Sequence, residues 1–125
     1  MIAYVSLYSA LYYHGIIEQI PSTVFAITSG KTKVFQTPLA KISLHHINPK
    51  LFTAYEIFGK NSVLMATPEK ALFDILYFMP AKSNLFRSLT EIELPKNFRF
   101  ELFDEWLKQV KSKSRANYIR NYLTL

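Results

Sequence analysis

The spacing of apolar residues predicts a helix at the start of the chain. Between Ser6 and His14 they recur every three or four residues, and Gly15 suits the left-handed position that ends such a helix. Ser6 is expected to cap this helix, because a serine oxygen can accept a hydrogen bond from an early backbone N–H. A core cannot hide every aromatic side chain of the helix, so some must lie at the surface or beneath another element: Tyr8, Tyr12 and Tyr13.

From residue 22 the pattern changes to an alternation of apolar and polar residues, which is typical of β-strands. The Ser29-Gly30 pair signals a turn, which makes 33–36 a candidate hairpin partner of 22–28. Mostly tight turns join the segments, and this favours an antiparallel or mixed sheet. About five short strands are expected, at 22–28, 33–36, 39–47, 51–58 and 63–66.

Helical patterns return in the second half of the chain. Thr67 is a suitable N-cap, Pro68 fits the first helical position, and the charge of Glu69 favours the positive end of the helix dipole. An apolar face follows, and Pro80 is expected to end this central helix. The remaining elements are a helix over 101–111, a last helix capped by Ser114, a short helical turn at 84–89 and a strand or extended loop at 91–94.

This order of elements predicts an α+β fold. An N-terminal helix, a central helix and C-terminal helices would accompany a mixed or antiparallel sheet of about five short strands. The chain has 125 residues, of which half are hydrophobic, so we expect a single domain over 1–125. It has neither a leader-like start nor an apolar run near the ~20 residues that a membrane span needs, so a cytoplasmic protein without a membrane partner is expected.

Composition then narrows the chemistry. The chain has no cysteine, which excludes disulfide scaffolds and thiolate sites, and its three glycines lie too far apart for a phosphate-binding loop. His45 and His46 are adjacent on a predicted strand, so one should pack and the other face solvent rather than share a metal ion. His14 is expected to carry a favourable charge at a helix C-terminus. We therefore expect no metal and no cofactor.

Three charged residues of the central helix raise a nuclease-like alternative. Glu69 and Asp74 are carboxylates, and Lys70 lies between them. A separation of five residues turns the two carboxylates by about 140° around the helix, which is poor for joint metal ligation. The favoured interpretation has Glu69 as a first-turn charge and Asp74 as a solvent-facing or packing residue. No nucleophile elbow is present either, so we expect a non-enzymatic protein.

The positive charge is concentrated in two parts of the chain. The net charge is +6, and residues 20–55 and 111–125 contain no acidic residue, whereas the middle of the chain is slightly acidic. A basic surface favours acidic partners, nucleic acid foremost. The candidate residues for contact with nucleic acid or a protein partner are Lys31, Lys33, Lys111, Lys113, Arg115 and Arg120.

Two segments together resemble one known family. Residues 4–17, YVSLYSALYYHGII, resemble the S-x-x-S-A-L-x-x-H-G-x-I helix of AbiEi-type antitoxins. Residues 66–74, ATPEKALFD, resemble the A-[ST]-P-E-[KR]-A-L-x-D helix start of the same family, and the resemblance covers about 4–79. The matched positions are Ser6, Ala10, Leu11, Gly15, Thr67, Pro68, Glu69, Lys70 and Asp74.

This resemblance implies a role in a type IV toxin–antitoxin, or abortive-infection, system. Such antitoxins combine an N-terminal winged helix that binds operator DNA with a C-terminal domain associated with antitoxin activity, and their toxin is nucleotidyltransferase-like. The sequence begins where that C-terminal domain begins, so operator DNA would be bound by a winged helix outside these residues. No catalytic residue is implied. Lys70 and Asp74 are matched polar positions without an obvious structural need, which makes them candidates for a functional or buried polar contact.

We therefore expect a non-enzymatic, antitoxin-like transcriptional regulator domain. It would act through protein contacts with the toxin and through contact of its basic surface with DNA. Two alternatives stay open at this point. One is a nuclease-like or degenerate nuclease domain that uses Glu69, Lys70 and Asp74. The other is an oligomerisation module, a homo-oligomer that uses the exposed tyrosines.

Overall fold

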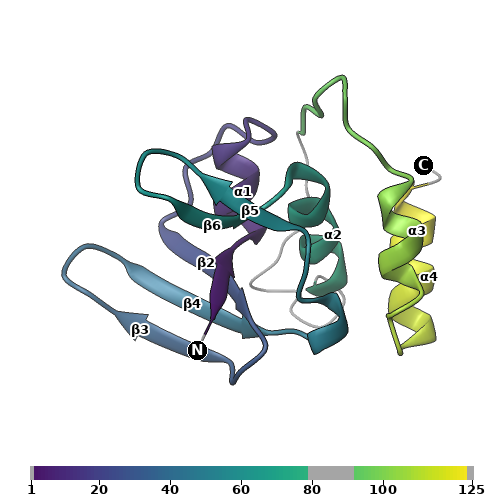
Figure 1. Cartoon of the computed structure of the whole chain (residues 1–125), viewed down its shortest axis with the longest axis horizontal. Helices are drawn as coiled ribbons and strands as arrows, with labels where there is room; N and C mark the ends of the chain where they lie inside the picture. Colours follow the sequence, from purple (N-terminus) through teal and green to yellow (C-terminus); the bar gives the residue numbers. More distant parts are fainter. Residues whose placement is uncertain (1, 79–91, 124–125) are drawn as a thin grey trace.

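A single mixed β-sheet forms one side of the molecule (Figure 1). The computed structural model describes residues 2–78 and 92–123 and confirms the α+β class. Within these residues the sheet has six strands in the order β3-β4-β2-β1-β6-β5. The strands are β1 (Ala3–Val5), β2 (Thr23–Thr28), β3 (Lys33–Gln36), β4 (Lys41–His46), β5 (Tyr55–Phe58) and β6 (Val63–Ala66).

The first strand was not expected from the sequence. β1 has only three residues, which is too short for an alternating pattern to identify it. It nevertheless lies near the middle of the sheet, antiparallel to β2 and parallel to β6. Its central residue, Tyr4, is buried.

The predicted hairpin between 22–28 and 33–36 is wrong. β4 lies between these two strands, parallel to β2 and antiparallel to β3. The physical reason is that a turn signal is local and does not choose the partner of a strand; β2, in which Phe25 to Thr28 are buried in succession, lies inside the sheet between β4 and β1. β3 exposes Lys33, Val34 and Gln36, which suits an edge strand. The mixed sheet itself agrees with the prediction.

Helices and one short 3₁₀ turn complete the described fold. In Figure 1, α2 lies between the sheet and the C-terminal helices, and it contacts α1, α3 and α4. In the described part of the chain, no helix has the length and apolar character that a membrane crossing requires. The helices are α1 (Leu7–Tyr13), α2 (Pro68–Phe78), α3 (Leu102–Leu107) and α4 (Lys113–Leu123), and the 3₁₀ turn is η1 (Pro49–Leu51).

The predicted helix ends are partly confirmed. Thr67 caps α2, since its Oγ1 accepts the N–H of Lys70 at 3.3 Å. Gly15 takes φ +76° after α1, and the next N–H returns to the carbonyl of Leu11 at 2.9 Å. The cap predicted at Ser114 is wrong, because α4 begins earlier and the Oγ of Ser112 accepts the N–H of Arg115.

Two other expectations differ in extent. α3 ends at Leu107, so it is shorter than the predicted helix over 101–111. Residues 92–94 are an extended loop without strand pairing, one of the two forms expected there, and the N–H of Glu93 donates to the carbonyl of Ile16 at 2.9 Å. The turn predicted at 84–89 and the helix end predicted at Pro80 lie outside the described residues.

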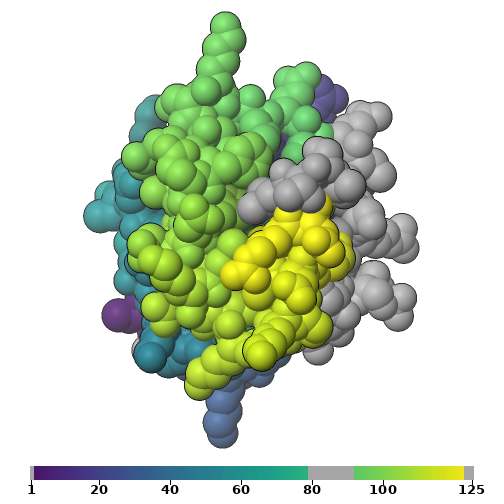
Figure 2. Space-filling view, turned by 90° about the vertical axis from the view of Figure 1, so that its right-hand side faces the viewer, coloured from purple at the N-terminus to yellow at the C-terminus, as the bar shows by residue number. Residues whose placement is uncertain are grey.

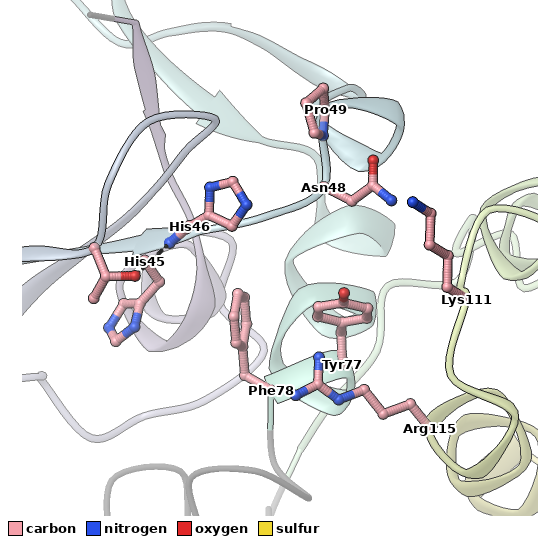
Figure 3. Close-up of a pocket in the computed structure, with 9 residues that line it drawn as sticks. His45, His46, Asn48, Pro49, Tyr77, Phe78, Lys111 and Arg115 are labelled. Carbon is pink, nitrogen blue, oxygen red and sulfur yellow. Dashed lines mark hydrogen bonds between the residues drawn. The ribbon is translucent and has the colours of Figure 1, made fainter.

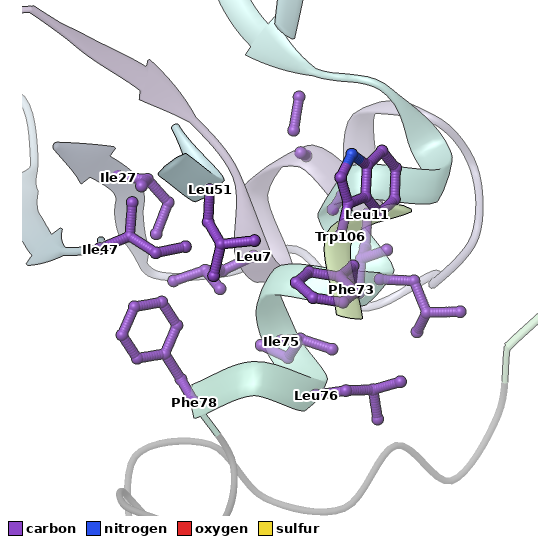
Figure 4. Close-up of a cluster of buried hydrophobic side chains, with 14 of the residues drawn as sticks. Leu7, Leu11, Ile27, Ile47, Leu51, Phe73, Ile75, Leu76, Phe78 and Trp106 are labelled. Atoms are coloured by element: carbon purple, nitrogen blue, oxygen red, sulfur yellow. The ribbon is translucent and has the colours of Figure 1, made fainter. Parts of the chain in front are cut away.

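The hydrophobic core is centred on α2. Every residue of this helix from Glu69 to Leu76 is buried, so it is enclosed on all sides instead of showing one apolar face. Figure 4 shows its side chains together with Ile27 of β2, Leu7 and Leu11 of α1, and Trp106 of α3. The ring of Phe73 meets those of Phe103 and Trp106 edge-on, with centroids 5.5 and 5.3 Å apart. This enclosure determines the surroundings of the polar residues on α2.

Candidate functional site: a buried ion cluster and a basic pocket

Residues of the two family-like motifs meet inside the protein. Lys70 and Asp74 are one turn apart on α2, and their Nζ and Oδ1 atoms lie 2.5 Å apart. The hydroxyl groups of Tyr4 and Ser6 both donate to Oδ2 of Asp74, at 2.9 and 2.7 Å. Lys70 also donates to the hydroxyl oxygen of Tyr4 at 2.9 Å. We call Tyr4, Ser6, Lys70 and Asp74 the buried ion cluster.

This cluster is sealed from solvent and internally satisfied. The Lys70 and Asp74 side chains are 0% exposed, and within the described residues no buried side-chain nitrogen or oxygen lacks a hydrogen-bond partner. Desolvation lowers the pKa of Lys70, while the neighbouring carboxylate opposes that shift. The pKa of Tyr4 is raised, first by burial and then by the charge of Asp74 and the hydrogen bond to it. These contacts give the cluster a structural role that joins β1, the start of α1 and α2.

Ser6 does not cap α1 as predicted. Its side chain makes no capping hydrogen bond, because the hydroxyl group is directed to Asp74 instead. The backbone of the next residue, Leu7, has φ +55°, a strained conformation for leucine. Two hydrogen bonds of Ser6 hold the chain in this turn: its hydroxyl group donates to Asp74, and its N–H donates to the carbonyl of Phe25 at 3.0 Å. The sharp turn thus positions a serine against a carboxylate 68 residues further along the chain.

Glu69 has a contact beyond its predicted place in the first turn of α2. It is buried, and its Oε2 accepts the backbone N–H of Arg99 at 3.0 Å. The contact ties the segment before α3 to the start of α2. Asp74, expected to be a solvent-facing or packing residue, is wholly buried as part of the ion cluster. The other matched positions are structural in a simpler way: Ala10 and Leu11 are buried in α1, Gly15 follows its end, and Pro68 is the first residue of α2.

The histidines occupy three different environments. His45 is buried and His46 exposed, as their adjacent positions on β4 predict. His14 contacts another element, since its Nε2 lies 2.8 Å from the carbonyl oxygen of Ala66 and therefore donates to β6. Its ring also lies edge-on to Phe58, with centroids 4.9 Å apart. In the described part of the chain, no group of three or more His, Asp or Glu side chains is placed to hold a metal ion.

A pocket of about 460 Å³ lies between the end of β4, the end of α2 and the start of α4 (Figure 3). The two acid-free runs of the sequence meet here, one through β4 and its flanking loops and the other through residues 111–115. None of its described lining residues is acidic. We call it the basic pocket, and its lining residues are Thr32, His45, His46, Asn48, Pro49, Tyr77, Phe78, Lys111 and Arg115.

Several of these side chains are oriented by neighbouring groups. The guanidinium of Arg115 lies over the ring of Tyr77, 4.8 Å from its centroid. Nδ1 of His46 lies 2.7 Å from the carbonyl oxygen of Gly30 and donates to it. The Oδ1 of Asn48 accepts the N–H of Lys50 at 3.0 Å, so its amide nitrogen is the group left to face the pocket. In Figure 3 that nitrogen is directed toward the ammonium group of Lys111.

The six predicted contact residues divide into two groups. Lys111 and Arg115 line the basic pocket, and they lie close to His46 and Asn48, which the sequence did not indicate as site residues. The only early signal for the pocket was that both parts of the chain lack acids. The others are exposed and do not line it: Lys31, Lys33, Lys113 and Arg120.

The C-terminal helices form a large part of one face of the molecule. Figure 2 views the molecule from the side of α3 and α4, which cover much of that face, with residues of the sheet region visible at its edges.

Comparison of the chain with models of protein families, with curated proteins and with solved structures found no match. The function is therefore inferred from the residues and their geometry.

Proposed function

We propose that this chain is a non-enzymatic regulatory domain of the AbiEi antitoxin type, which acts by binding. The observation that carries the proposal is the buried ion cluster. Asp74 of the second family-like segment accepts hydrogen bonds from Ser6 of the first segment and from Lys70 of its own helix, although 68 residues separate Ser6 from Asp74 in the sequence. Two separate resemblances thereby become one structural unit. This coherence supports the resemblance, and the regulatory role follows from it.

The geometry weakens the nuclease-like alternative. Lys70 and Asp74 have no exposed surface, and Glu69 is bonded to the backbone of Arg99, so none of the three is presented to a substrate. A general acid or base must come within hydrogen-bond reach of the reacting group. A cleavage assay with Mg²⁺ and supercoiled DNA tests this point. Cleavage by the wild type that is lost in Glu69→Ala, with folding retained, would favour the nuclease.

The basic residues supply the binding surface in this proposal. Lys31 and Lys33 are exposed at or beside β3, and Lys113 and Arg120 are exposed on α4, so each acid-free run exposes positive charge in a different part of the molecule (Figure 1). Such a surface attracts the phosphates of operator DNA or an acidic region of a nucleotidyltransferase-like toxin. Lysine and arginine release counterions from DNA when they bind it, so salt should weaken that contact steeply.

Co-expression with the product of the neighbouring gene tests the proposal. If that product inhibits growth, the wild-type chain should restore growth, and Lys113→Ala/Arg120→Ala should restore it less well. The matched control is Lys60→Ala/Lys96→Ala, which removes the same charge from exposed positions outside the two acid-free runs. A toxic neighbour that the soluble wild-type chain does not counteract would contradict the proposal.

A second candidate role is self-association through the exposed tyrosines. Tyr12 and Tyr13 are 39% and 51% exposed at the end of α1, and Tyr13 contacts Phe58 of β5. Exposed aromatic side chains are enriched at protein interfaces. Sedimentation of the wild type and of Tyr12→Ser/Tyr13→Ser tests this role. A wild type that stays monomeric at high concentration would rule it out.

A further inference from the structure

We propose that the basic pocket binds the phosphate monoester of a nucleotide. The site does not include Lys31, Lys33, Lys113 or Arg120, and it does not depend on the regulatory role proposed above. It combines a cationic rim with a partly apolar floor, and these correspond to the two chemical halves of a nucleotide. Its volume of about 460 Å³ falls in the range of about 300–1,000 Å³ that small-molecule sites occupy.

The rim is arranged to receive an anion. Lys111 and the amide group of Asn48 are both hydrogen-bond donors, and Figure 3 shows their nitrogens directed toward one another. Two facing donors repel unless an acceptor lies between them, and a phosphate oxygen would accept from both. None of the described lining residues is a carboxylate that could take this place. The described part of the rim thus has no counterpart of Asp74, which supplies the counter-charge of Lys70.

The guanidinium group of Arg115 is oriented so that it can bind the same ligand. Its guanidinium lies over the ring of Tyr77, which fixes the plane of the group and leaves its N–H edge for a second acceptor. Arginine binds phosphate through two parallel N–H bonds, and this pairing depends on such a fixed plane. His46 is anchored through Nδ1 to the carbonyl oxygen of Gly30, which fixes the orientation of its ring beside the pocket.

The floor of the pocket explains why a nucleotide is favoured over a free phosphate ion. Phe78 and His45 are buried side chains with ring centroids 5.7 Å apart, and Pro49 adds apolar surface. Flat rings of this kind favour a planar organic group, such as a base, over water. A phosphate ion would engage only the rim and leave this surface uncovered.

The phosphate monoester could come from a free mononucleotide or from the 5′ end of a nucleic acid strand. Isothermal titration calorimetry distinguishes these two sources. One arm compares adenosine 5′-monophosphate with adenosine, and the other compares a thymidine hexanucleotide with and without a 5′-phosphate. We expect the phosphorylated probe of at least one arm to bind at least 10-fold more tightly than its unphosphorylated form. The arm with that difference identifies the source.

Asn48→Asp is the sharpest variant. Its carboxylate can still accept the N–H of Lys50, so the local turn is kept, but it places a negative charge beside Lys111 and opposes an anion. Binding should fall at least 10-fold. Asn61→Asp makes the same change at an exposed turn outside the pocket and should alter affinity less than 2-fold.

Lys111→Ala and Lys113→Ala form a second pair that removes equal charge. Only Lys111 lines the pocket, so its loss should weaken binding at least 10-fold, while Lys113→Ala should change it less than 3-fold. Circular dichroism of each variant confirms that the fold is retained. The proposal is overturned if neither phosphorylated probe binds better than its unphosphorylated form. Equal losses within both folded pairs would also overturn it, since they would indicate a diffuse charge effect.

Discussion

The buried ion cluster and the basic pocket differ in whether a neighbouring acidic group compensates their positive charge. In the cluster, Lys70 is fully buried, and Asp74 lies beside it with two hydroxyl donors completing the arrangement. In the pocket, Lys111 and Arg115 face a solvent-accessible space, and no acidic residue is found among the described lining. The two regions are adjacent to the same helix, α2, yet among the described residues only the cluster contains its own counter-charge.

This difference shows how an internal contact can be told from a binding site. A buried charge is costly unless a partner compensates it, so a cluster that is fully satisfied is part of the architecture. Charges gathered around a space without a counter-charge are electrostatically incomplete, and a ligand of opposite sign completes them. The cluster accordingly supports the fold, and the pocket is the region that we expect to bind.

The largest predicted effect is on stability, when the counter-charge in the cluster is removed. Asp74→Ala leaves Lys70 without its partner in the core, and the free energy of unfolding should fall by about 3–5 kcal/mol. Urea denaturation measures this change. Asp104→Ala, at an exposed position on α3, is the control and should stay within about 0.5 kcal/mol of the wild type. A loss below about 1 kcal/mol for Asp74→Ala would show that the cluster is not sealed.

The next effect separates charge from packing at the same site. Lys70→Met/Asp74→Leu replaces the pair with apolar side chains of similar length, and it should be more stable than Asp74→Ala despite the second substitution. No buried charge then remains without a partner. The same urea series measures it. If the double variant is less stable than Asp74→Ala, the buried lysine contributes more through packing than through its charge.

Alkaline pH should destabilise the protein through Tyr4. Its folded-state pKa is raised, so above about pH 10 the unfolded chain loses a proton that the folded chain keeps. This group alone then lowers the free energy of unfolding by about 1.4 kcal/mol per pH unit. Lys70 contributes in the opposite direction near pH 10.5, because its folded-state pKa is lowered and the unfolded chain still releases the lysine proton there, and this contribution fades about one pH unit higher.

Tyr4→Phe should remove that part of the slope. Urea midpoints of wild type and variant between pH 10.5 and 11.5 (about the range where an unfolded tyrosine titrates) measure the difference. Tyr13→Phe, at a 51% exposed position, is the matched control. Parallel slopes for the wild type and Tyr4→Phe would contradict the buried position of the phenol.

A smaller loss of stability is expected from Ser6→Ala. This change removes one of the donors to Asp74 while Tyr4 and Lys70 remain in place. The free energy of unfolding should fall by about 1–3 kcal/mol, the usual effect of losing a buried hydrogen bond to a charged group. Thermal denaturation follows the change, with Ser22→Ala at an exposed position as control. Equal melting temperatures for the two variants would show that the Ser6 contact is dispensable.

The smallest effect on stability should come from the pocket. Lys111→Ala and Arg120→Ala remove exposed charges and should each change the free energy of unfolding by less than about 0.5 kcal/mol. The two variants should differ in binding instead, because only Lys111 lines the pocket. Denaturation curves collected beside the titrations separate the two quantities. A large destabilisation by Lys111→Ala would make the lysine part of the architecture, contrary to the comparison.

Local signals in the sequence predicted much of the fold. Thr67 and Pro68 define the start of α2, because a cap and a first-turn proline act within a few residues. Strand pairing could not be predicted in this way. The turn signal at Ser29-Gly30 predicted that β2 pairs with β3, but β4 lies between them. No local pattern reports which strands become neighbours, and the strand with four successive buried residues, β2, lies inside the sheet.

The candidate sites show the same limit more strongly. The sequence indicated that Lys70 and Asp74 had a polar role, but the bond from Ser6 crosses 68 residues and could not be read from spacing. The resemblance to one family drew attention to Ser6, Lys70 and Asp74, but it did not show that their side chains are bonded to one another. The pocket was foreseen only as two basic runs, because the gathering of His46, Asn48, Lys111 and Arg115 around one pocket depends on how the chain folds between them.

One measurement tests the contrast between the two regions directly. In a titration of ¹⁵N-labelled protein with adenosine 5′-monophosphate, backbone amide shifts report every residue at once. The account predicts shifts centred on His46, Asn48, Lys111 and Arg115, with little change at Ser6, Lys70 and Asp74. Shifts centred on the buried ion cluster, or spread evenly over the exposed lysines, would contradict it.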